Sequence, residues 1–127
     1  IDAGAWPLAV GDVVALALVF SAGAVHHNGT AFLLANPGYW AATILPFILG
    51  WIAAAPLLGA YSAGAAESAK ASVPLAVRAW VVGGVVGLGL RATPLFHGGI
   101  QPIFVAVTLV TGALGLAVWR WVFFRVR

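Results

Sequence analysis

The sequence contains no cysteine and no methionine, and it has very few charged residues. Without cysteine the chain can form no disulfide, no thiolate-ligated zinc site and no iron–sulfur cluster. Only 7% of the 127 residues are charged, whereas roughly a quarter are charged in a soluble domain, whose surface must face water. Because 63% of the residues are hydrophobic and the mean hydropathy is +1.07, the composition excludes a soluble enzyme and predicts an integral membrane protein.

The net charge and the distribution of basic residues also limit the possible partners. The formal net charge is +3, but the six basic residues are scattered along the chain and form no basic stripe. We therefore expect contact with the lipid bilayer and no binding to nucleic acid.

Since Ile1 is not an initiator methionine, we expect residues to precede it. The acidic Asp2 and Asp12 stand where a signal peptide would be basic.

Four apolar segments are long enough to cross a bilayer as helices, which takes about 20 residues each. They cover approximately residues 7–25, 39–60, 73–90 and 102–121. No segment alternates between polar and apolar residues, as a membrane β-strand would. The sequence therefore predicts an all-α membrane protein in which residues 1–127 form a single bundle of four transmembrane helices.

The distribution of lysine and arginine predicts the orientation of the bundle. With four spans, both termini and the connection between the second and third spans lie on one side of the membrane. That side holds five of the six basic residues, namely Lys70, Arg78, Arg120, Arg125 and Arg127, and the other side holds only Arg91. Cytoplasmic loops carry the excess of positive charge, so we expect both termini in the cytoplasm.

Two prolines, Pro46 and Pro56, fall inside the second predicted span. Each removes a helix hydrogen bond and tends to kink the helix. A kink that serves packing is favoured over a hinge that serves transport, although the broken helices of transporters keep the second interpretation open.

Asp12 is the most informative residue, because a carboxylate inside a span is costly and needs compensation. At helical spacing it shares a stripe with small residues and with His26, which favours a position facing the bundle. Arg78 is predicted at a similar depth in the third span, so an Asp12–Arg78 pair is the leading hypothesis; alternatively Arg78 extends to the interface. Asp12 is then either an ion or proton site or a purely structural partner, and the second reading is slightly favoured.

A row of glycines in the third span predicts a close contact between helices. Gly83, Gly84 and Gly87 share one face with Arg91, and small residues four apart let two helix backbones approach closely. Gly112 and Gly115 in the fourth span could supply the facing groove. The pattern leaves open whether the contact lies within one chain or between two.

Three histidines, His26, His27 and His97, fall at the side opposite the termini. Together with Arg91 they could line a vestibule, sense pH or bind a metal. Adjacent histidines in a loop usually diverge, so solvated side chains are favoured and we expect no metal. The sequence also has no familiar catalytic set and no nucleotide-binding loop. We therefore expect no catalytic residues, no cofactor and, on balance, no enzyme.

Several short motifs resemble a family of uncharacterised small prokaryotic membrane proteins, a domain-of-unknown-function family found in salt-loving archaea and actinobacteria. The resemblance runs from Gly11-Asp12 in the first span, through Pro46-Phe47 and Gly50-Trp51, to Arg78-Ala79-Trp80 and the stretch that ends at Arg91. It implies four transmembrane helices in a prokaryotic cell membrane. It implies no activity, and it marks Asp12, His26, Pro46, Trp51, Arg78 and Arg91 as the residues to test first.

Three functions remain in competition. The first is a small homo-oligomeric transporter or channel with Asp12 and Arg78 along a polar route, and with Arg91 and His26 at its mouth. The second is a structural or accessory subunit of a larger membrane complex. The third, least favoured, is a membrane protein that binds an apolar cofactor or a lipid.

Overall fold

The computed structural model describes residues 2–96 and 98–127, and all regular structure in this part of the chain is helical. Four long helices make up the bundle: α1 (Trp6–Asn28), α3 (Pro37–Ala54), α4 (Ala69–Arg91) and α5 (Pro102–Val126). Three short elements join or precede them: η1 (Ala3–Ala5), α2 (Thr30–Ala35) and η2 (Gly64–Ala66). The four long helices, with η1 continuing α1, are long and apolar enough to cross a membrane. The predicted fold class is therefore confirmed.

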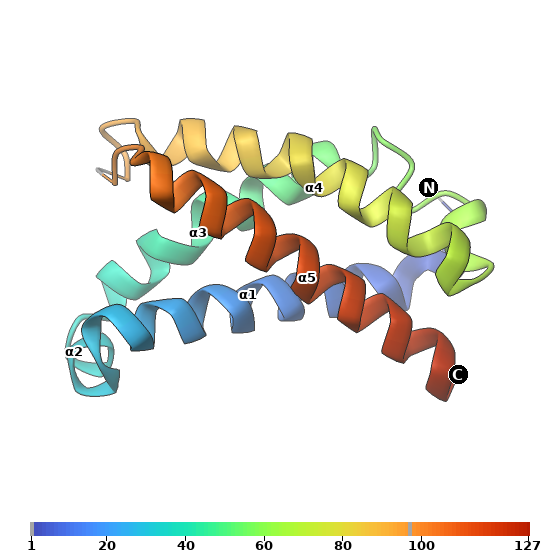
Figure 1. The fold of residues 1–127 in the computed structure, drawn as a ribbon, viewed down its shortest axis with the longest axis horizontal. Helices are drawn as coiled ribbons and strands as arrows, with labels where there is room; N and C mark the ends of the chain where they lie inside the picture. Colours follow the sequence, from blue (N-terminus) through green and yellow to red (C-terminus); the bar gives the residue numbers. More distant parts are fainter. Residues whose placement is uncertain (1, 97) are drawn as a thin grey trace.

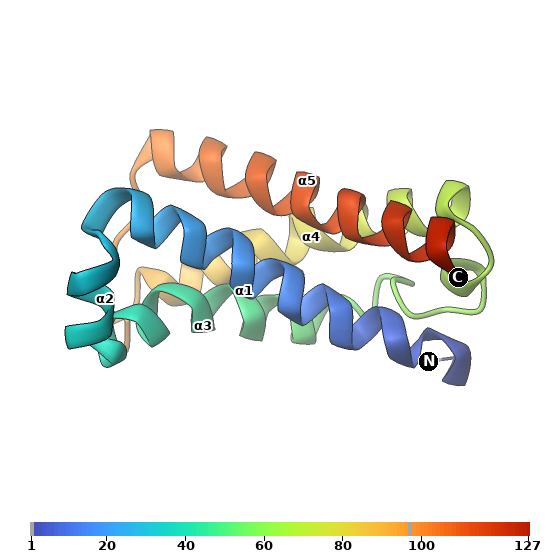
Figure 2. The same ribbon diagram turned by 90° about the horizontal axis from the view of Figure 1, so that it is seen from below.

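The four long helices run up and down, so the N-terminus and the C-terminus lie at the same end of the bundle (Figures 1 and 2). We call this the terminal end, and we call the opposite end, which holds α2 and residues 92–96 and 98–101, the loop end. Around the bundle the helices follow the order α1, α3, α4 and α5, and α5 returns to contact α1. The most extensive contact joins α3 and α4.

Helix starts follow the local sequence. Proline stands in the first turn of α1, α3 and α5, where its missing N–H costs nothing. The α4 helix begins instead with a side-chain cap, since the Ser68 hydroxyl accepts a hydrogen bond from the backbone N–H of Ala71 at 3.2 Å.

The two prolines of the second predicted span have different positions. Pro46 lies inside α3 and is fully buried. Pro56, predicted to kink the same span, lies beyond the end of α3 at Ala54, so that prediction is wrong, as is the extension of the span to residue 60. A proline cannot donate the next helical hydrogen bond. The chain turns here, and Gly59 adopts a φ of 83° that favours glycine.

Aromatic side chains fill the centre of the bundle. The rings of Phe20 and Phe47 stack with their centroids 4.6 Å apart, and Trp51 and Trp80 are fully buried beside them. The Trp80 indole N–H donates to the Leu109 carbonyl at 3.0 Å, which joins α4 to α5. Buried aromatic groups with a bonded N–H give large apolar contact without an unsatisfied donor.

The glycine row predicted in the third span makes its contact within the chain. A Cβ on Gly83 would meet the backbone of Gly50 and Trp51, and one on Gly87 would meet Phe47 and the Pro46 carbonyl. The helix that faces Gly83 and Gly87 is therefore α3, whereas Gly84 faces Leu109 of α5. Gly112 and Gly115, suggested as the facing groove, are not the partners of Gly83 and Gly87.

The glycines of α5 serve other contacts. Gly112 makes room for the Trp80 indole, and Gly115 lies against Val19 of α1. Gly84 packs beside Trp80 and Leu109. Since the glycines of the α4 row are already covered by α3 and α5, a second copy of the chain would have to associate through another face.

Candidate functional site

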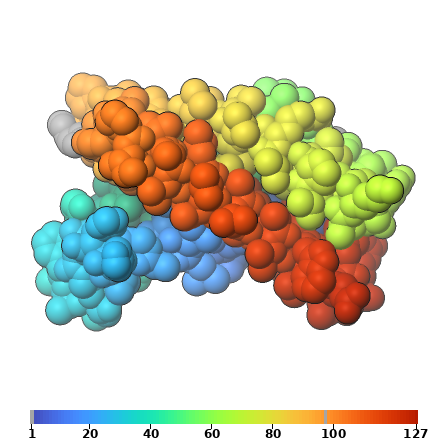
Figure 3. All heavy atoms as spheres, viewed as in Figure 1, coloured from blue at the N-terminus to red at the C-terminus, as the bar shows by residue number. Residues whose placement is uncertain are grey.

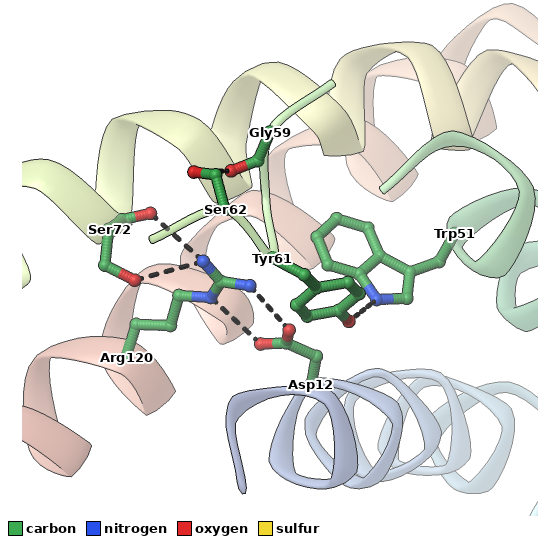
Figure 4. Close-up of polar contacts among 7 residues, drawn as sticks. All are labelled: Asp12, Trp51, Gly59, Tyr61, Ser62, Ser72 and Arg120. Atoms are coloured by element: carbon green, nitrogen blue, oxygen red, sulfur yellow. Dashed lines mark hydrogen bonds and ion pairs between the residues drawn. The ribbon is translucent and has the colours of Figure 1, made fainter. Parts of the chain in front are cut away.

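A buried ion pair joins the first and last helices of the bundle. Arg120 of α5 donates to Asp12 of α1 through two nitrogens, with Nη2 to Oδ2 at 2.7 Å and Nε to Oδ1 at 3.1 Å (Figure 4). Both side chains have zero relative exposure. Two parallel bonds between a guanidinium and a carboxylate give the strongest form of such a pair.

The same guanidinium also reaches α4. Its Nη1 donates to the Ser72 hydroxyl at 3.0 Å and to the Ser72 carbonyl at 3.3 Å. Arg120 therefore ties α1, α4 and α5 together near the terminal end. A charge removed from solvent needs a partner and several hydrogen bonds to be tolerated, and Arg120 has both.

Tyr61 covers one side of the ion pair. Its ring centroid lies 5.6 Å from the Arg120 guanidinium carbon, and its hydroxyl accepts a hydrogen bond from the Trp51 indole at 2.7 Å (Figure 4). Burial raises the pKa of the Tyr61 phenol, and the negative charge of Asp12 raises this pKa further. The phenol is thus held in its neutral form.

The structure places the predicted partner, Arg78, elsewhere. Arg78 is exposed, and its guanidinium donates to the Leu58 carbonyl just after α3. Carbonyls that follow a helix lack helical partners and attract cations. The Asp12–Arg78 pair is therefore wrong as a geometric prediction, and Arg120 takes the place assigned to Arg78.

A signal for Arg120 was present in the sequence. The buried residues of α5 recur every four positions, at Thr108, Gly112, Leu116 and Arg120. The buried residues of α1 follow the same rule, at Leu8, Asp12, Leu16, Phe20 and Ala24. Residues four apart share one face of a helix, so both charges lie on the faces that point into the bundle.

A large groove separates α1 from α5 toward the loop end. The two helices cross near the middle of the bundle and diverge toward the loop end (Figure 1), and the space-filling view shows the recess between them (Figure 3). Its volume is about 1,090 Å³, at the upper end of the roughly 300–1,000 Å³ typical of ligand sites. The lining is mainly aliphatic and aromatic, from residues such as Val14, Leu18, Val107, Leu114 and Val118.

The two ends of the groove differ in chemistry. Polar groups gather at the loop end, and they come from His26, His27, Asn28, Tyr39, Thr43 and Arg91. Two of these, His26 and Arg91, are the residues that the sequence predicted together at the mouth of a polar route. His97 lies outside the described residues. At the opposite end Trp119 lies directly against Gly11, where even a Cβ would overlap the indole ring. Its indole nitrogen is buried and makes no hydrogen bond within the described part of the chain.

Arg91 is fixed from two directions at the polar end. Its Nε donates to the Gly99 carbonyl at 3.2 Å, and its guanidinium carbon lies 4.1 Å from the centre of the Phe104 ring in the first turn of α5. Across residues 2–96 and 98–127, no three histidine, aspartate or glutamate side chains come together to hold a metal ion.

Residues 9–123 match the model of a family described as a protein of unknown function, DUF3054. The match covers nearly the whole chain, so the chain belongs to this family. No curated protein and no solved structure is significantly similar to it. The family description carries no activity, and the geometry of the chain itself must supply the functional argument.

Proposed function

We propose that the protein binds one amphiphilic, lipid-like molecule in the groove between α1 and α5. The observation that carries the proposal is the groove itself, with its volume of about 1,090 Å³ and its mainly apolar lining. Along α1 the groove extends from Gly11 to Asn28, which is roughly 25 Å at the helical rise of about 1.5 Å per residue. This length covers most of a hydrocarbon core of about 30 Å.

The groove also opens at the side of the bundle rather than into its centre (Figure 3). An apolar molecule dissolved in the bilayer can therefore enter it laterally, without crossing a polar barrier. The polar residues at one end and the apolar residues along the rest match the two parts of an amphiphile.

The geometry gives less support to an ion or proton pathway along Asp12 and Arg78, which the sequence suggested. Asp12 is completely buried, and both of its carboxylate oxygens accept hydrogen bonds from Arg120. A carboxylate that binds or relays an ion needs access to that ion, whereas this one is bonded and covered. The pair is better suited to holding α1, α4 and α5 together, and any transport by this chain would carry a lipid-like molecule through the groove.

Native mass spectrometry after gentle detergent extraction tests the proposal. We expect one small-molecule mass to remain on each wild-type chain. Gly23 lines the groove, and a Cβ added there meets no atom within 4 Å. The ring of Gly23→Phe should extend into the groove and lower the occupancy by roughly tenfold, about 1.4 kcal/mol.

Gly89→Phe is the matched control. Gly89 is also an exposed helical glycine with open space around it, but it lies outside the groove lining. Equal occupancy in the two variants, or a wild-type chain that carries no small molecule, would contradict the proposal. A stable second protein in place of the small molecule would also contradict it and would favour an accessory subunit.

A further inference from the structure

We infer that the molecule in the α1–α5 groove is a membrane lipid with an anionic phosphate headgroup, and that Arg91 binds this headgroup at the loop end. The inference rests on the proposed function and adds the chemical class and the direction of the ligand. It places the apolar tail along the groove, toward Trp119.

The first support is the balance of charge along the groove. Arg91 is the one arginine or lysine in its lining, and the lining contains no aspartate or glutamate. The whole sequence has only three acidic residues, Asp2, Asp12 and Glu67. Asp12 is already paired with Arg120, so the positive charge of Arg91 lacks a counter-charge among the described residues of this end.

The second support is the way in which Arg91 is held. Its Nε donates a hydrogen bond to the Gly99 carbonyl, and one face of the guanidinium lies over the Phe104 ring. The two terminal nitrogens make no hydrogen bond with the described residues, although the side chain is only partly exposed. A planar guanidinium fixed in this way presents two parallel donors, which match the oxygens of a phosphate.

The surroundings of Arg91 suit the same ligand. The α5 helix begins at Pro102 beside this end of the groove, and the N-terminus of a helix favours negative charge. Tyr39 lines the groove at the same end, and its hydroxyl can donate to a headgroup oxygen. The Thr43 hydroxyl beside it donates to the Tyr39 carbonyl at 3.0 Å. The remaining length of the groove is lined mainly by apolar residues. Of its two threonines, Thr108 and Thr111, the second donates its hydroxyl hydrogen to the Val107 carbonyl of its own helix at 2.7 Å.

The test uses the whole protein in nanodiscs that contain equal amounts of phosphatidylglycerol and phosphatidylcholine with identical acyl chains. The lipid that stays bound after transfer to detergent is measured by native mass spectrometry. Both lipids carry a phosphodiester, but the trimethylammonium group of phosphatidylcholine cancels its charge and brings a second cation close to Arg91. We therefore expect the wild type to retain phosphatidylglycerol over phosphatidylcholine by about tenfold.

Variants of Arg91 locate the preference. Arg91→Gln should abolish it while total lipid retention continues, and Arg91→Lys, which keeps the charge, should restore part of it. Arg125→Gln is the matched control, since Arg125 also lies over an aromatic ring, that of Trp121, but lies outside the groove. It should leave the preference unchanged.

The outcomes separate the inference from the function on which it rests. Equal retention of the two lipids by the wild type overturns the anionic headgroup but leaves the lipid-binding groove in place. A preference that survives Arg91→Gln overturns the role of Arg91. Retention of neither lipid overturns the proposed function and the inference together. The comparison of the two lipids on the wild type needs no variant, so it decides the headgroup even if Arg91→Gln fails to fold.

Discussion

Asp12 and Arg120 stand 108 positions apart in the sequence, yet they form a bidentate ion pair that is completely buried. The pair joins α1 to α5 and helps to close the ring of four helices toward its terminal end. The two helices also meet where Gly115 lies against Val19. They diverge toward the loop end (Figure 1), and the groove runs between them. The pair that holds the bundle thus lies at the closed end of the groove.

Removal of one member of the ion pair should destabilise the protein strongly. Arg120→Gln leaves the Asp12 carboxylate buried without its counter-charge, and such a loss costs about 3–5 kcal/mol. The free energy of unfolding in mixed micelles, followed by circular dichroism, measures the effect. Arg125→Gln, a change of an exposed arginine, should alter this free energy by less than about 0.5 kcal/mol.

The double variant Asp12→Leu with Arg120→Met distinguishes a charge effect from a packing effect. Apolar side chains of similar size often replace a buried ion pair with little loss. We therefore expect the double variant to be more stable than Arg120→Gln alone. A double variant that is as unstable as the sum of the two single changes would show that the pair acts through its shape and bonds to Ser72 rather than through mutual neutralisation.

The close contact between α3 and α4 should not tolerate a side chain at Gly50. A Cβ there would overlap the Gly83 carbonyl oxygen and approach the Gly87 nitrogen, and backbone atoms cannot move aside cheaply. Gly50→Ala should lower the free energy of unfolding by about 1–3 kcal/mol, as overpacking does. Gly89→Ala, where the added carbon meets open space, should instead stabilise the helix by up to about 1 kcal/mol. Equal effects at the two sites would mean that the helices are not in backbone contact.

Tyr61 should make the protein sensitive to alkaline pH. Its pKa is raised in the folded chain, first by burial and then by Asp12, above the value of about 10 of an unfolded tyrosine. The folded state therefore holds the phenolic proton more tightly. This contribution to stability is complete below about pH 10 and is lost as the pH rises through the folded pKa.

Thermal unfolding measured between about pH 8 and pH 12 should show this loss of stability above about pH 10. Tyr61→Phe should make the loss smaller, and Tyr39→Phe serves as the control on a tyrosine that lies away from the ion pair. The expectation fails if Tyr61→Phe leaves the slope of stability against pH unchanged.

The fold could be predicted from the sequence because hydrophobicity and helix length are properties of each segment alone. All four spans were found in this way, and the clearest error was the end of the second one, where Pro56 stops the helix instead of bending it. The glycine row of α4 also predicted a close contact correctly. Its partner was missed because the two glycines of α3, Gly38 and Gly50, are far apart in the helix and form no repeating pattern.

The ion pair could be predicted only in part. The cost of burying Asp12 predicted a polar partner. The sequence gives only the depth of a residue along the membrane normal, however, and depth alone does not say which helix lies beside α1. Arg120 was counted with the basic residues of the terminal side, although its spacing from Gly112 and Leu116 puts it on the buried face. The groove was not predicted, because it depends on the angle between α1 and α5, which involves the packing of the whole bundle.

An experimental structure of the protein, crystallised from a lipid mesophase at a resolution that shows alkyl chains, would show directly whether a lipid occupies the groove. We expect one continuous chain of density in the groove, running from the neighbourhood of Trp119 and Gly11 to Arg91, with a headgroup at the guanidinium. A groove that is closed by direct contact of α1 with α5 along its length, with no molecule between them, would contradict this expectation.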